Sequence, residues 1–211
     1  MDYLKNLMDR MVKEKRLTIR NPERFSWGDK KRCEKIFREI FVKVDQSLAT
    51  YEHLPEYDEV VEWMTDTDGL GLLLMGDCGR GKSIIITGMI PVLLAIKQCH
   101  TFPVHADDFG KPYPLAASTM GMDPNSKFLD YLVRAKYPII DELGVEPLVN
   151  DYGEKYEGFN LVMNAAERYM RPVFISTNLT TIDMLNRYGE RTMDRLQHLC
   201  RIVEFKGDSL R

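Results

Sequence analysis

The sequence predicts an α/β fold built on a mostly parallel sheet, and three observations lead to this prediction. Five short apolar runs follow Gly69, helical stretches separate the runs, and a glycine-rich segment comes directly after the first run. The runs are LGLLLM (70–75), FPVHA (102–106), YPIIDEL (137–143), PVFIST (172–177) and RIVEF (201–205). Buried strands that alternate with helices are typical of a parallel sheet covered on both faces.

The stretch before the first strand is predicted to be helical, and it differs in charge from the rest. Residues 1–45 hold 13 Lys and Arg against 8 Asp and Glu, a net charge of +5, whereas residues 46–211 hold 16 against 24, a net charge of −8. Apolar residues recur at helical spacing in three groups: Leu4, Leu7, Met8 and Met11; Cys33, Ile36, Phe37, Ile40, Phe41 and Val44; and Tyr57, Val60, Val61 and Met64. We therefore expect a basic helical arm at 1–45 and one domain at 46–211. Such an arm can approach nucleic acid or an acidic protein surface.

Composition is that of a folded protein without a membrane segment. Of the 211 residues, 44% are hydrophobic and 29% are charged, as in ordinary globular domains. No apolar run approaches the roughly 20 residues that a membrane span needs, and the first residues lack the apolar core of a signal peptide. We therefore expect a cytoplasmic location and no membrane partner. The four cysteines and four histidines show no metal-ligand or disulfide spacing, so we interpret them as reduced thiols and as surface or packing side chains.

The most specific motif is GDCGRGKS, which satisfies GxxxxGK[ST] between an apolar strand and a helix-forming run. Its glycines allow positive φ angles and bring backbone N–H groups against phosphate oxygens at a helix N-terminus. Lys82 can reach the β and γ phosphates, and the Ser83 hydroxyl can bind Mg²⁺. The motif predicts a site for ATP and Mg²⁺. The nucleotide-binding residues that it predicts are Gly76, Asp77, Cys78, Gly79, Arg80, Gly81, Lys82, Ser83 and Ile84.

Two adjacent acids at the end of the run YPIIDEL supply the second part of the predicted site. Asp141 can hold Mg²⁺ through water, and Glu142 can polarise the water that attacks the γ phosphate. Asn178 follows the run PVFIST, and it can orient the same water if its strand lies between the other two. This set of residues favours hydrolysis of ATP over transfer of its phosphate.

The order of motifs resembles one group of ATPases. GxxGxGKS, IIDELG, RYMRPVFISTNLT, YGERTMDRL and FKGDSLR are similar, in this order, to motifs of the AAA+ ATPases of the DnaC and IstB type, which are replicative helicase loaders and transposition helpers. The resemblance covers residues 65–211. It implies a five-stranded parallel sheet of order 5-1-4-3-2 flanked by helices, with a minimal or absent C-terminal lid.

The resemblance also implies a site that a neighbouring subunit completes. Asn178 corresponds to the first sensor, Arg195 to the arginine finger offered to the next subunit's ATP, and Arg211 to the second sensor. Arg191 lies one helical turn from Arg195 and can support it. The implied protein is an ATP-dependent homo-oligomer that loads a replicative DNA helicase on single-stranded DNA. Two alternatives remain: a transposition helper that works with a transposase on double-stranded DNA, and an ATP-switched binding protein with incidental turnover.

Overall fold

The structure is a computed structural model that describes residues 1–14, 16–17, 22–46, 51–119, 121–151 and 153–210. Five parallel strands form its central sheet in the order β2-β3-β6-β1-β7. The strands are β1 (Gly71–Gly76), β2 (Val104–His105), β3 (Ile139–Leu143), β6 (Phe174–Thr177) and β7 (Cys200–Phe205). Counted along the sheet from β7, this is the predicted order 5-1-4-3-2, so the α/β prediction and the strand order are confirmed.

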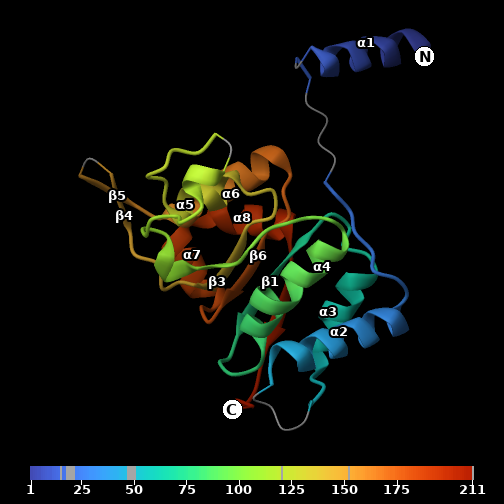
Figure 1. The fold of residues 1–211 in the computed structure, drawn as a ribbon, viewed down its shortest axis with the longest axis vertical. Coiled ribbons are helices and arrows are strands. Elements are labelled where there is room, and N and C mark those ends of the chain that lie inside the picture. The colour runs from blue at the N-terminus through green and yellow to red at the C-terminus, as the bar shows by residue number, and fades with distance from the viewer. Residues whose placement is uncertain (15, 18–21, 47–50, 120, 152, 211) are drawn as a thin grey trace.

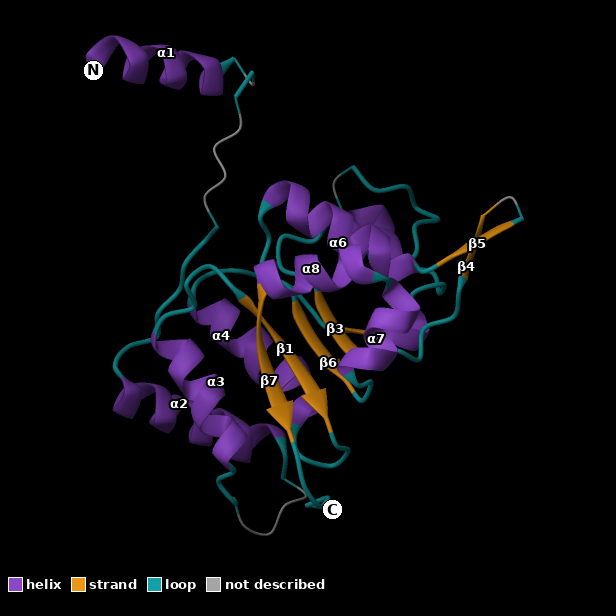
Figure 2. Cartoon of the chain, turned by 180° about the vertical axis from the view of Figure 1, so that it is seen from behind, coloured by secondary structure: helices purple, strands orange, loops and turns teal. Residues whose placement is uncertain are grey.

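Helices cover both faces of the sheet (Figures 1 and 2). Leu72 and Leu74 of β1 pack into one core cluster, whereas Leu73 and Met75 pack into the other, because successive strand residues point to opposite faces. The first cluster includes residues of α2 (Lys30–Val44), α3 (Pro55–Thr65) and α4 (Ile90–Ile96). The second includes residues of α5 (Phe128–Arg134), α6 (Gly158–Tyr169), α7 (Thr181–Tyr188) and α8 (Glu190–Leu199).

The expected arm has two parts that differ in packing. Helix α1 (Asp2–Lys13) has no buried residue and lies apart from the remainder of the chain (Figures 1 and 2). Helix α2 begins after Asp29, whose side chain accepts a hydrogen bond from the Arg32 N–H, and it buries Cys33, Phe37 and Phe41 in the first core cluster. The apolar stripe of α2 therefore belongs to the sheet's covering layer, although its charge placed it with the arm.

The helix that follows the first strand changes its winding before Pro91. Residues Ile84–Met89 form a π-helical segment, and the Ile90 N–H donates to the carbonyl of Ile85, five residues earlier. Proline has no N–H to donate, so the normal helical ladder is interrupted at this point. Helix α4 then continues to Ile96.

The remaining elements are short and lie between β2 and α6. Two 3₁₀ turns, Ala106–Asp108 and Ala116–Ser118, lie on either side of the segment 109–114. Strands β4 (Val149–Asp151) and β5 (Glu154–Tyr156) pair as an antiparallel hairpin that projects from the body (Figures 1 and 2). Among the described residues, no helix combines the length and apolar character needed to cross a membrane.

Candidate nucleotide-binding site

The phosphate loop, residues 76–83, connects β1 to its helix as the sequence predicts. Gly76, Gly79 and Gly81 all have positive φ angles. A Cβ atom on Gly81 would lie 2.6 Å from the Tyr57 hydroxyl and 3.0 Å from Phe41 Cζ, so no larger residue fits the loop there. The loop is therefore shaped by its own glycines and by aromatic side chains of α2 and α3.

Lys82 folds back over the loop at the start of the helix. Its Nζ donates to the carbonyls of Gly76 at 2.8 Å and Asp77 at 2.6 Å. Burial lowers the pKa of the Lys82 ammonium, while nearby negative groups, Asp141 and Glu142 included, act to raise it. When a polyphosphate binds to the N–H groups of the loop, the Lys82 ammonium can donate to phosphate oxygens in place of these two carbonyls.

One cavity brings most of the predicted residues together. It is lined by Cys78, Gly79, Gly81, Lys82, Ser83 and Ile84 from the loop and its helix, and by Glu142, Ser176, Thr177 and Asn178 from the ends of β3 and β6. Strand β6 lies between β1 and β3, as the role predicted for Asn178 requires. Parallel strands end at the same edge, and this edge is where ligands bind in open α/β sheets.

Ser176 joins the two acids, and sequence analysis missed it. Its hydroxyl donates to the Asp141 carboxylate and accepts from the Glu142 N–H at 2.9 Å. Glu142 has a φ of 56°, a left-handed conformation that costs a non-glycine residue free energy and occurs often at functional sites. Ser176 lies on β6 two residues before Asn178, which directly follows the strand, so the period-two pattern could have placed both side chains on one face.

His105, which was interpreted as a surface or packing residue, is a partly exposed side chain that contacts Glu142 of the acidic pair. Its Nε2 lies 3.1 Å from Glu142 Oε2. His105 ends β2 in register with Asp141 on β3, so the two strand ends meet at the edge where the cavity opens. The signal available in the sequence was its position at the end of the run FPVHA.

Arg80 belongs to the loop but turns away from the cavity. Its guanidinium pairs with Glu56 of α3 at 2.6 Å, and only 9% and 7% of the two side chains are exposed. The Arg80 carbonyl accepts from the Tyr57 hydroxyl at 3.0 Å. Neither partner was predicted, because Glu56 and Tyr57 precede Arg80 by 24 and 23 residues. The pair fixes the outer side of the loop to α3.

The C-terminal segment, residues 206–210, lies against the same side of the loop. The Gly207 N–H donates to Asp77 Oδ2 at 2.8 Å, Arg80 Nη1 to the Asp208 carbonyl at 3.0 Å, and the Leu210 N–H to the Gly79 carbonyl at 3.1 Å. No helical lid follows β7 within the described part of the chain. Arg211, which the resemblance assigns as the second sensor, is outside the described residues.

The two arginines of α8 are not among the residues that line the cavity. Arg195 is 8% exposed, and its Nε donates to Glu167 of α6 at 2.5 Å while Nη1 donates to Asn164. Arg191 is exposed. Within one subunit, Arg195 therefore joins α8 to α6, whereas Arg191 points into solvent.

A buried carboxylate links the segment after Glu142 to the helix before α8. Glu146, which is 3% exposed, accepts hydrogen bonds from the Gly144 N–H at 2.7 Å and from the Tyr188 hydroxyl. Arg187 donates to the carbonyls of Gly144 and Glu146 and pairs with Glu157 at 3.0 Å. These bonds connect the acidic strand end with α7, the helix that leads into α8.

The cavity has the donors that a nucleoside triphosphate and Mg²⁺ require. A loop with three glycines at positive φ precedes the first helical turn, Lys82 is the cation of the cavity, and the Ser83 hydroxyl offers an oxygen ligand of the kind that Mg²⁺ prefers. Asp141 is not among the lining residues, but it adjoins Glu142 on β3 and accepts a hydrogen bond from Ser176, which lines the cavity, so its carboxylate offers a second oxygen ligand next to the cavity. The residues present therefore fit both groups.

The sheet order, the phosphate loop at the end of β1 and the acidic pair near the end of β3 define a P-loop fold of the AAA+ type. Among solved structures, DnaI has a TM-score of 0.55 and 17% identity over 80% of this chain and 94% of its own. The DnaC helicase loader has a TM-score of 0.56 and 15% identity over 79% of this chain and 98% of its own. The replication initiator DnaA bound to AMPPCP and single-stranded DNA has a TM-score of 0.51 and 14% identity over 77% of this chain and 49% of its own.

No family model matches the sequence, and no curated protein matches it. Because these solved structures are only 14–17% identical to this chain, the likeness shows its fold, which is the AAA+ fold.

Proposed function

We propose that this chain is an ATP-hydrolysing AAA+ protein that loads a replicative DNA helicase. The observation that carries the catalytic part is the single cavity in which the phosphate loop, Glu142 and Asn178 meet. The similarity to the DnaC helicase loader, which extends over 98% of that chain, supports the loading part.

The main polar residues of the site have roles that follow from their positions. The loop N–H groups and Lys82 bind the phosphates, and Glu142 and Asn178 lie where they can orient and polarise an attacking water. When bound, Mg²⁺ neutralises phosphate charge, and Ser83 and Asp141 are the residues that would hold it. Ser176 keeps both acids in place.

Two substitutions separate binding from turnover. Lys82→Ala removes a contact made to the phosphates before and during reaction, so ATP binding should be lost. Glu142→Gln alters only the group that acts on water, so binding should persist while turnover is lost. Binding of a fluorescent ATP analogue and release of phosphate measure the two steps, and Lys155→Ala on the exposed hairpin is the control. Equal loss of binding in both variants contradicts the role of Glu142.

We propose that the ATP site is completed by α8 of a neighbouring subunit in an ATP-dependent homo-oligomer. The cavity has Lys82 as its only cationic side chain among the described residues, whereas phosphoryl transfer is strongly accelerated by an added arginine. Arg195 is the assigned finger, and in this role it must leave Glu167 and Asn164, while Arg191 is already exposed one turn earlier.

Mixing of variants tests the shared site. Arg195→Ala and Glu142→Gln should each be inactive alone, with turnover reduced by about 10²-fold or more. The mixture forms some interfaces with both working residues, so part of the turnover should return. The same mixture with Arg191→Ala shows which arginine acts. No recovery from either mixture, with assembly shown by light scattering, contradicts a shared site.

The partner is tested with the full chain. Glu142→Gln should hold the ATP-bound assembly, and this variant is mixed in turn with a purified replicative helicase and with a purified transposase. Binding to the helicase supports the loader, binding to the transposase supports the helper, and binding to neither favours the ATP-switched binding protein.

A further inference from the structure

Helix α2 has two faces of opposite character. Its inner face buries Cys33, Phe37 and Phe41 against the core. Its remaining surface carries six cations and two anions, namely Lys30, Lys31, Arg32, Lys35, Arg38 and Lys43 against Glu34 and Glu39. The whole chain has a net charge of −3, so this helix, at +4, is a concentrated positive region on an otherwise acidic protein.

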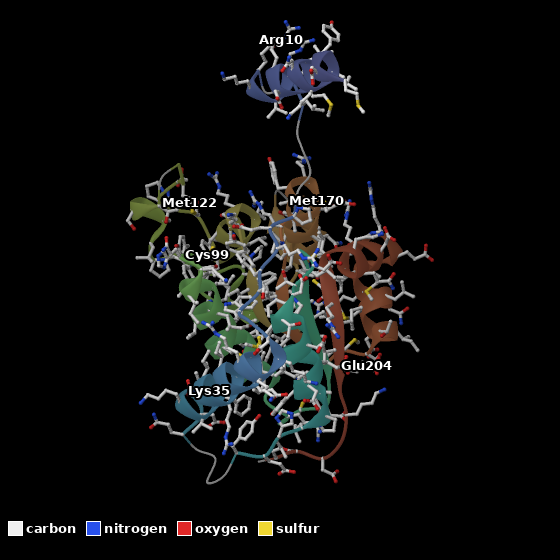
Figure 3. All side chains as sticks on the ribbon, turned by 90° about the vertical axis from the view of Figure 1, so that its right-hand side faces the viewer. Arg10, Lys35, Cys99, Met122, Met170 and Glu204 are labelled. Atoms are coloured by element: carbon white, nitrogen blue, oxygen red, sulfur yellow. The ribbon has the colours of Figure 1, made fainter. Side chains whose placement is uncertain are left out.

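The cations of this surface are mostly not neutralised by carboxylates. Among the described residues, the one ion pair on the helix joins Lys35 to Glu39 at 3.8 Å, with both side chains largely exposed. A shallow groove runs along the helix, lined by Lys31, Lys35, Arg38, Glu34, Glu39 and Val42 among others. Figure 3 labels Lys35 on α2, where its side chain projects away from the body, and Arg10 on α1, which stands apart.

We propose that this outer face of α2 binds the phosphate backbone of nucleic acid. From Lys31 to Lys43 the helix rises about 18 Å, which spans about five base-pair steps of a duplex. A protein partner would require an apolar centre, and Val42 is the one apolar side chain in the groove. Rows of Lys and Arg with little apolar surface match a polyanion instead.

The inner face of α2 places this surface next to the ATP site. Phe41 packs against Gly81 of the phosphate loop, and Val44 packs against Gly88 of the helix that follows it. Nucleic acid on the outer face therefore lies about one helix diameter, roughly 10 Å, from the loop. Since coupling between binding sites is reciprocal, ATP should change the affinity for nucleic acid by the same factor as nucleic acid changes the affinity for ATP.

The inference rests on the proposed action on DNA, and charge reversal tests it. The double variant Lys31→Glu, Lys35→Glu is compared with Lys5→Glu, Lys13→Glu on α1, which changes the formal charge equally. Fluorescence anisotropy with a labelled single strand and a labelled duplex is measured over a range of salt concentrations. Loss of two phosphate contacts should weaken duplex binding about 60-fold at 0.1 M salt and reduce the slope of log affinity against log salt by about 1.8.

Three outcomes overturn the inference: an unchanged slope in the α2 variant, an equal loss in the α1 control, or binding of wild-type chain to polyglutamate but to neither nucleic acid. Turnover of ATP and the melting temperature are measured on the same samples, and both should remain at wild-type values because the two lysines are exposed. If the chain hydrolyses ATP but does not bind nucleic acid, the proposal for α2 fails and the ATPase proposal stands. A chain without turnover contradicts the ATPase proposal instead.

Discussion

Replacement of Ser176 by alanine tests how the acidic pair is held. Ser176 is buried, with 1% of its surface exposed. Its hydroxyl donates one hydrogen bond to the Asp141 carboxylate and accepts one from the Glu142 N–H. Alanine removes a charge-assisted bond worth about 1.5–3 kcal/mol and leaves the partly buried Glu142 N–H without this partner, at a cost of up to about 1–3 kcal/mol. Because the cavity admits water next to this site, part of this cost is recovered, and we expect a net loss of about 3 kcal/mol.

For a chain of this length, 1 kcal/mol shifts the melting temperature by about 2–4 °C, so Ser176→Ala should melt about 6–12 °C lower than wild type. Turnover should fall about tenfold, because Asp141 and Glu142 lose their common partner and with it their alignment. Thermal unfolding by circular dichroism and a phosphate-release assay measure the two effects.

Ser118→Ala is the matched control. Its hydroxyl is exposed and bonds only to the Leu115 carbonyl of its own turn, so stability should change by less than about 0.5 kcal/mol. A Ser176→Ala variant that melts within 2 °C of wild type and keeps full turnover refutes the role given to this serine.

Three further expectations concern the same domain. Glu142→Gly and Glu142→Gln should both lose turnover. In chemical denaturation the glycine variant should be about 1 kcal/mol more stable than the glutamine variant, because glycine adopts the left-handed backbone without steric strain and this gain exceeds its larger loss of backbone entropy on folding. Removal of residues 1–21 should leave the melting temperature unchanged, whereas removal of 1–45 deletes the buried phenylalanines of α2 and should prevent folding as judged by circular dichroism. Glu56→Gln leaves Arg80 without its buried partner, so calorimetry should show a melting temperature about 6 °C lower and weaker ATP binding.

Local sequence patterns determined the parts of this protein whose cause is local. The phosphate loop was predictable because its glycines, Lys82 and Ser83 are adjacent along the chain and lie between a strand and a helix. The acidic pair was predictable because Asp141 and Glu142 lie near the end of an apolar strand. Side-chain periodicity also found the helices before β1, and the strand order came from a resemblance and agrees with the sheet.

Contacts between distant segments were decided only by the tertiary structure. Ser176 meets the acids from the neighbouring strand, Glu56 of α3 meets Arg80 of the loop, and Arg195 is bound by side chains of α6 about 30 residues earlier. Charge assigned α2 to an arm, yet its buried stripe made it part of the core. No local period encodes such pairings, because they depend on which strand ends and helix faces the packed sheet brings together.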